Sequence, residues 1–209
     1  MKILIIGASA KTSIGNMLGE TLQDEGHKVS YASRSGSLGA KCDISDPKEV
    51  RRLIRRTQPD VVILGAGLFL KPHRIGRLRD YERIKGHLVA KSFGPLLVAD
   101  AMNFSGKKAS LVVLAGRDIS GNPGFAPYSI GNGAIRNLVR FINTHERIRA
   151  FYIDLPFVSG STMEKQFSRS ARADTATGGV NSNDIARVVR KILAGREKRE
   201  RIVLGKGTT

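Results

Sequence analysis

The chain opens with Met1-Lys2-Ile3-Leu4-Ile5-Ile6-Gly7-Ala8-Ser9-Ala10-Lys11-Thr12-Ser13-Ile14-Gly15-Asn16-Met17-Leu18-Gly19, an apolar run that stops at a glycine and is followed by small residues and a helical pattern. An unbroken apolar run of this length is typical of a buried parallel strand. Small residues after it let the backbone approach a pyrophosphate, and the next helix points its positive end at the anion. The opening stretch therefore predicts a dinucleotide site.

Beyond this stretch, short apolar runs alternate with helical patterns along the whole chain. We expect strands at 2–6, 28–32, 40–42, 60–64, 111–114, 150–154 and 201–204, and helices at 13–25, from about 45, at 80–103, 128–144 and 183–194. Ser13 and Asn183 are the expected caps of the first and last helices. The alternation predicts a single α/β domain over residues 1–209, a Rossmann-like, doubly wound parallel sheet of about seven strands with helices on both faces.

The chain of 209 residues carries a formal net charge of +17. Such a charge favours polyanions, or it belongs to a solvated surface. The basic runs at 51–56 and 196–201 are interrupted by apolar residues or acids, as on the outer faces of amphipathic helices. Because there is no tryptophan, no stacking platform for single strands can be recognised. We therefore expect any nucleic-acid binding to be non-specific and to weaken with salt.

The cysteine and histidine residues indicate the cellular compartment and whether the chain binds a metal ion. Cys42 is the only cysteine, so no disulfide can form within the chain and a cytoplasmic location is expected. The four histidines show no metal-ligand spacing, so we expect no metal site. No stretch approaches the roughly 20 apolar residues of a membrane span, so no membrane association is expected.

Further motifs follow the predicted strands. Gly7-x5-Ser13-Ile14-Gly15 resembles the longer glycine loop of divergent short-chain dehydrogenases/reductases, and the resemblance to this superfamily extends over nearly the whole chain. The segment 46–67 also resembles the extended sugar-nucleotide reductases, although 209 residues leave no room for their substrate domain. The resemblance implies cofactor contacts at Gly7, Ser9, Ser13, Ile14, Gly15, Ser33, Arg34, Ser35, Asp43, Ile44, Gly65, Ala66, Gly67, Pro156, Val158 and Thr162.

The end of the second strand bears on the choice of cofactor. NAD-dependent proteins place a carboxylate there, which accepts a hydrogen bond from the ribose 2′-hydroxyl. This strand ends in Ala32-Ser33-Arg34, without an acid. A carboxylate would repel a 2′-phosphate, whereas the Arg34 guanidinium can bind one with two parallel hydrogen bonds. The sequence therefore favours NADP(H) over NAD(H).

The expected active site departs from the family pattern. By resemblance, the chemistry needs a tyrosine, a lysine four residues later, a serine about 13 residues earlier and an upstream asparagine. Tyr128 occupies the tyrosine position, and the other three positions fall on Asn132, Ala115 and Lys91. A nearby ammonium lowers the pKa of a tyrosine from its usual value of about 10. Neutral Asn132 cannot do so, and Ala115 cannot hydrogen-bond a carbonyl.

Three interpretations remain open. In the first, the protein is an oxidoreductase acting on a carbonyl or alcohol, with a rebuilt site in which Lys91 supplies the ammonium from the neighbouring helix. The substrate contacts then come from Ser120, Ser129 or Arg117. In the second, the protein binds NADP(H) without turnover, as a sensor or structural subunit. In the third, it is a basic scaffold for nucleic acid or an acidic partner.

The resemblance also bears on substrate and assembly. Residues 159–182 occupy the place of the family's substrate lid. Their basic side chains suggest an anionic small-molecule substrate: Lys165, Arg169 and Arg172. The helices at 80–103 and 128–144 form the subunit interface in the family, which implies a homo-oligomer, a dimer or tetramer, with a homodimer as the default.

Overall fold

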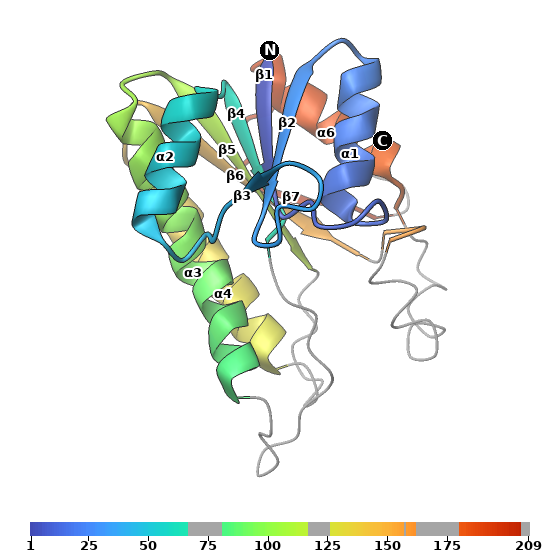
Figure 1. Ribbon diagram of the computed structural model, residues 1–209. Coiled ribbons are helices and arrows are strands. Elements are labelled where there is room, and N and C mark those ends of the chain that lie inside the picture. The colour runs from blue at the N-terminus through green and yellow to red at the C-terminus, as the bar shows by residue number, and fades with distance from the viewer. Residues whose placement is uncertain (67–80, 117–125, 157, 162–179, 206–209) are drawn as a thin grey trace.

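The computed structural model describes residues 1–66, 81–116, 126–156, 158–161 and 180–205. Seven parallel strands form one sheet in the order β3-β2-β1-β4-β5-β6-β7 (Figure 1). The strands are β1 (Lys2–Ile6), β2 (Lys28–Ser33), β3 (Ala40–Lys41), β4 (Val61–Leu64), β5 (Ala109–Gly116), β6 (Ile148–Leu155) and β7 (Arg201–Val203). The helices are α1 (Ile14–Asp24), α2 (Pro47–Thr57), α3 (Tyr81–Phe104), α4 (Ala126–Ile142) and α6 (Ser182–Leu193). The predicted fold class is confirmed.

The strand order reverses beside β1. Ile6 is in register with Ala32 of β2 on one side and with Leu64 of β4 on the other. β2 and β3 lie on one side of β1 in the sheet. The chain then crosses to the other side of β1, where β4, β5, β6 and β7 follow in order. In open parallel sheets, ligands bind outside the carboxyl ends of the strands at such a reversal.

Helices cover both faces of the sheet (Figure 1). One layer consists of α1 and α6, whose buried Leu18 and Ile185 pack against odd-numbered apolar residues of β1 such as Ile5. The other layer consists of α2, α3 and α4, which bury Val98 and Ile135 against the opposite face. Burial on both faces explains why the strands are continuous apolar runs.

The helix starts follow capping chemistry. The Ser13 side chain accepts a hydrogen bond from the Asn16 N–H, which confirms its predicted role as the N-cap of α1. Asp46 caps α2 and Pro47 occupies its first turn. The prediction that Asn183 caps the last helix is wrong. Asn181 and Asp184 form a capping box there, because their side chains each satisfy the other's backbone N–H.

β5 and β6 are longer than predicted, whereas β7 ends one residue before its predicted end. β5 begins at Ala109 and β6 ends at Leu155, and every residue of one pairs in register with the other. The residues that β5 gains at its ends, namely Ala109, Ser110, Ala115 and Gly116, are small or polar and do not stand out in the sequence, yet their backbone groups continue the ladder. No described helix is both long and apolar enough to cross a membrane.

Candidate functional site

The turn after β1 brings the backbone of two strands together. Gly7 has a φ of +107°, and its N–H donates to the Ala32 carbonyl at 2.8 Å. A Cβ at this position would lie 2.6 Å from the Ala66 nitrogen, so no side chain fits. Gly7 therefore forms the tight turn at the topological switch point that its place in the sequence predicts.

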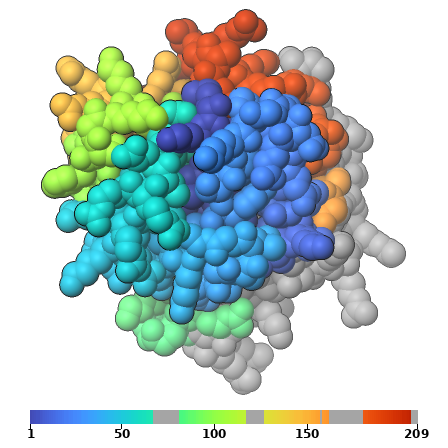
Figure 2. Space-filling view, turned by 45° about the horizontal axis from the view of Figure 1, so that its top comes forward, coloured from blue at the N-terminus to red at the C-terminus, as the bar shows by residue number. Residues whose placement is uncertain are grey.

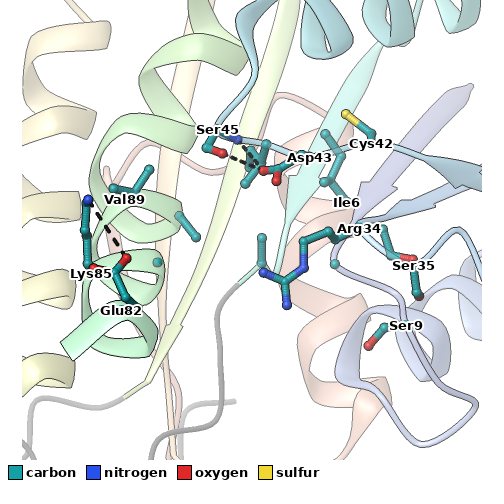
Figure 3. A pocket seen from close by; sticks show the side chains of 16 residues that line it. Ile6, Ser9, Arg34, Ser35, Cys42, Asp43, Ser45, Glu82, Lys85 and Val89 are labelled. Carbon is teal, nitrogen blue, oxygen red and sulfur yellow. Dashed lines mark hydrogen bonds and ion pairs between the residues drawn. The ribbon is translucent and has the colours of Figure 1, made fainter. Parts of the chain in front are cut away.

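A cavity of about 370 Å³ opens beside this turn. It lies between the carboxyl ends of the strands and the first turns of α3 (Figure 3). In the space-filling view, the segment between β2 and α2 lies next to the start of α3 (Figure 2). The lining residues are Ile6, Gly7, Ser9, Ser33, Arg34, Ser35, Cys42, Asp43, Ile44, Ser45, Ala66, Glu82, Lys85, Gly86, Val89 and Ala90.

Arg34, Ser33 and Ser35 line the part of the cavity that follows β2. The Arg34 side chain extends between the strand ends and α3 (Figure 3). The Ser35 hydroxyl lies 3.2 Å from that of Ser33 and 3.0 Å from that of Ser37. The Ser37 hydroxyl in turn donates to the Ser9 carbonyl at 2.7 Å, which ties this loop to the glycine loop. The result is a cationic, hydroxyl-rich pocket wall.

Asp43 lies across the cavity from these hydroxyls. Its carboxylate accepts hydrogen bonds from the Ser45 hydroxyl at 2.7 Å and the Ser45 N–H at 2.9 Å. These two bonds and the nearby Arg34 charge hold the pKa of Asp43 below its usual value. Beside it, burial raises the pKa of the Cys42 thiol to about 11, so this cysteine stays a protonated part of the wall.

The cavity brings together about half of the cofactor residues predicted from the sequence, namely Gly7, Ser9, Ser33, Arg34, Ser35, Asp43, Ile44 and Ala66. Others do not line it, namely Ser13, Ile14, Gly15, Gly65, Pro156 and Val158. Gly15 is buried against β1, where a Cβ would lie 3.0 Å from the Ile5 Cγ2, so its role in the described structure is close helix–strand packing. Gly67 and Thr162 lie outside the described residues.

A second cluster lies at the carboxyl end of β5, where α3 packs against α4. The Lys91 side chain on α3 is buried, and its Nζ donates to the Leu114 carbonyl at 3.2 Å. Burial lowers the pKa of Lys91 to about 8, because a desolvated ammonium is unfavourable. An exposed helix lysine would show neither property. Lys91 therefore differs from the basic residues on the surface of the chain.

Asn132 faces the same strand from α4. Its Nδ2 donates to the Gly116 carbonyl at 2.8 Å, while its Oδ1 is buried and has no hydrogen-bond partner among the described residues. Ala115, between the two carbonyls, is buried and carries no polar side-chain atom. Buried polar atoms in native proteins are usually paired, so this oxygen marks a place where a polar ligand atom would gain a partner.

Tyr128 lies one helical turn before Asn132 and is mostly buried. Its ring contacts His87 of α3 edge to face, with the ring centroids 4.7 Å apart and an interplanar angle of 68°. His87 is fully buried, and the sequence-based predictions did not include it among the site residues. Its position one turn before Lys91 was the available signal, because residues four apart share a helix face.

Several predicted features fall outside the described residues. They include the substrate candidates Arg117 and Ser120, most of the expected lid at 159–182, and its basic residues Lys165, Arg169 and Arg172. Within the described ranges, no group of three or more His, Cys, Asp and Glu side chains could hold a metal ion.

Comparison with known proteins agrees with this geometry. Residues 3–91 match the NAD dependent epimerase/dehydratase family, and this match includes the segment 46–67 that resembles extended reductases. No curated protein matches the chain in sequence.

Solved structures share the fold along nearly the full chain. The protein lin1944 from Listeria innocua is 18% identical, with a TM-score of 0.77, and 98% of this chain and 99% of that one are covered. A short chain dehydrogenase from Burkholderia cenocepacia in complex with NADP is 15% identical, with a TM-score of 0.80 and coverage of 97% and 95%. The closed form of a serine dehydrogenase complexed with NADP+ is 14% identical, with a TM-score of 0.80 and coverage of 100% and 96%.

The sheet order and the strand reversal beside β1 define a Rossmann-like α/β fold. The chain shares this fold with solved short-chain dehydrogenases, and residues 3–91 are similar to the NAD dependent epimerase/dehydratase family.

Proposed function

We propose that this protein is an NADP(H)-dependent oxidoreductase that interconverts a carbonyl and an alcohol on a small-molecule substrate. The observation that carries the proposal is the cavity at the switch point, which Arg34, Ser33 and Ser35 line together. We assign this part of the cavity to the adenosine ribose. A guanidinium with hydroxyl donors fits a 2′-phosphate. The Gly7 turn, which excludes a side chain, fits a close approach of pyrophosphate to the backbone.

The residues that would hold the cofactor follow from this cavity. Arg34, Ser33 and Ser35 would bind the 2′-phosphate, and the Gly7–Ser9 backbone would face the pyrophosphate. Asp43 and Ile44 would contact the adenine edge. The predicted contacts at the nicotinamide end stay proposals: Ser13, Ile14, Gly15, Gly65, Gly67, Pro156, Val158 and Thr162. When bound, the nicotinamide supplies or accepts the hydride.

The proton chemistry would come from the second cluster. Tyr128 would give a proton to the carbonyl oxygen during reduction and take it back during oxidation. Lys91, buried on α3, would stabilise the phenolate in place of a lysine on α4. Asn132 and Ala115 would occupy the remaining family positions, where Asn132 holds β5 and offers its amide oxygen to a polar ligand atom.

The subunit arrangement is a further part of the proposal. Phe93 on α3 and Ile130 and Phe141 on α4 are 59%, 60% and 55% exposed. Apolar side chains on the two helices that form the family's interface support a homodimer. The anionic substrate, the cytoplasmic location, the single domain over 1–209 and non-specific nucleic-acid binding stay predictions.

Calorimetric titration with NADPH and NADH, followed by assay of a panel of aldehydes and ketones, tests the function. We expect NADPH to bind at least tenfold more tightly than NADH, and Tyr128→Phe to abolish turnover without changing NADPH affinity. NADPH binding with no turnover by the wild type would favour a sensor or structural subunit. Absence of binding by either cofactor would contradict the proposal and favour the basic scaffold.

A further inference from the structure

His87 has surroundings that are unusual for a histidine in the core of a protein. It lies on α3 one turn before Lys91, and its side chain is fully buried. Its ring packs against that of Tyr128 in a T-shaped arrangement, with the ring centroids 4.7 Å apart. Because positions four apart share a helix face, His87 and Lys91 both point at α4. The two polar residues that α3 buries here therefore flank the proposed proton donor.

A glycine on α4 makes this approach possible. A Cβ added at Gly131 would lie 3.1 Å from the Lys91 Cβ and 3.5 Å from the His87 Nε2. The lack of a side chain lets the two helices come close and brings the imidazole and the lysine stem against the backbone between Tyr128 and Asn132. Gly131 therefore lies on α4 where the polar side chains of α3 pack against it.

Two other polar side chains lie near the imidazole. Lys91 is one turn further along α3, and the ring of Tyr128 on α4 packs against the His87 ring. Arg83 lies one turn earlier, on the exposed part of α3. The two nitrogens of an imidazole can each take part in a hydrogen bond, which suits a buried histidine to orient a phenol.

We propose that His87 is a positioning residue for Tyr128, so that α3 carries the support that α4 lacks. His87 acts through Tyr128 and does not touch the substrate. This inference rests on the proposed function, because it assigns His87 a role in the proton transfer of that same site.

Nuclear magnetic resonance of protein labelled with 13C at the tyrosine Cζ tests the inference. The Tyr128→Phe variant identifies the Tyr128 signal, which then reports the ionisation of its phenol as pH is raised. His87→Phe keeps a ring for packing but removes both nitrogens, whereas His87→Gln keeps a polar donor and acceptor but no ring. His87→Met takes the place of His87→Phe if that variant does not fold.

A positioning role predicts a particular order among the variants. His87→Phe should change the ionisation constant of Tyr128 at least fivefold, and His87→Gln should stay within twofold of the wild type. For any carbonyl that the protein reduces, His87→Phe should lower kcat at least tenfold and leave the KM for NADPH within twofold. A Tyr128 titration in His87→Phe that superimposes on the wild type would overturn the inference and leave His87 as core packing.

The NADPH titration separates this failure from failure of the proposed function. If NADPH binds and Tyr128→Phe abolishes turnover while His87→Phe has no effect, the inference on His87 is wrong and the function stands. If neither cofactor binds, the function itself is wrong, and His87 loses its role with it.

Discussion

Lys91 and Asn132 donate hydrogen bonds to carbonyl groups of the same strand from two different helices. The Lys91 Nζ reaches the Leu114 carbonyl from α3, and the Asn132 Nδ2 reaches the Gly116 carbonyl from α4. In the proposed site, the lysine and the asparagine lie on the opposite helices from those that the family resemblance implies. The pair keeps one cation and one amide at the end of β5, which is the basis for assigning the lysine's role to Lys91.

Replacing the buried ammonium should stabilise the protein at neutral pH. The pKa of Lys91 falls from 10.5 to about 8 on folding, and at about 1.4 kcal/mol per pH unit this costs the charged form about 3 kcal/mol. The unfolded chain binds the proton more tightly, so the wild type gains stability as pH rises from 8 towards 10.5. We expect Lys91→Met to raise the free energy of unfolding at pH 7 by up to this amount.

Urea unfolding at pH 7 and pH 9.5 measures this linkage. The advantage of Lys91→Met over the wild type should shrink at the higher pH, because the folded wild type no longer holds a charged lysine. Lys85→Met, on an exposed turn of the same helix, is the matched control and should show no such pH dependence. An advantage that is equal at both pH values would show that Lys91 is not desolvated.

Removing the Arg34 guanidinium should weaken NADPH binding selectively. A hydrogen bond to a charged group contributes about 1.5–3 kcal/mol, so Arg34→Ala should reduce NADPH affinity roughly 10- to 100-fold and leave NADH affinity within about threefold. Arg55→Ala, an exposed arginine on α2 that does not line the cavity, controls for the change in net charge. Equal losses for both cofactors would indicate that Arg34 does not contact the 2′-phosphate.

Two glycines on α4 offer a matched pair. Gly131→Ala places a methyl group 3.1 Å from the Lys91 Cβ, whereas a methyl group at Gly133 meets nothing within 4 Å. We expect Gly131→Ala to destabilise the protein by about 1–3 kcal/mol through overpacking. Gly133→Ala should stabilise it by about 0.5–1 kcal/mol because alanine favours the helix. Thermal unfolding of both variants gives the comparison, and similar effects of both would argue against close packing of α3 on α4.

Exposed apolar residues should determine the oligomeric state. Phe141→Glu places a charge on the apolar face of α4 and should convert a dimer to a monomer in size-exclusion chromatography with light scattering. Phe104→Glu changes an exposed phenylalanine at the end of α3 and serves as a comparison. A wild type that is monomeric at high concentration would contradict the proposed assembly.

The strand pattern and several residues of the switch-point cavity could be predicted from local sequence, whereas the second cluster could not. Gly7 and Arg34 could be placed because a glycine after an apolar run and a missing acid after the next strand have local physical meaning. The burial of His87 and Lys91 depends on how α3 packs against α4. Because the buried face of α3 carries these two polar residues beside apolar ones, hydrophobicity does not mark that face in the sequence. At α6, the N-x-x-D pattern of Asn181 and Asp184 would have identified the cap correctly.

The proposed role of Lys91 is tested most directly by measuring the ionisation of Tyr128 in NADP+-bound protein. The 13C resonance of the tyrosine Cζ reports it in variants that remove the lysine from α3 or move it to α4. We expect Lys91→Asn to lower the ionisation constant of the Tyr128 phenol at least tenfold, because a nearby ammonium stabilises the phenolate. The double variant Lys91→Asn/Asn132→Lys, which returns the lysine to α4, should restore it. A Tyr128 titration that is the same in the wild type and in Lys91→Asn would contradict the claim that Lys91 supplies the ammonium of this site.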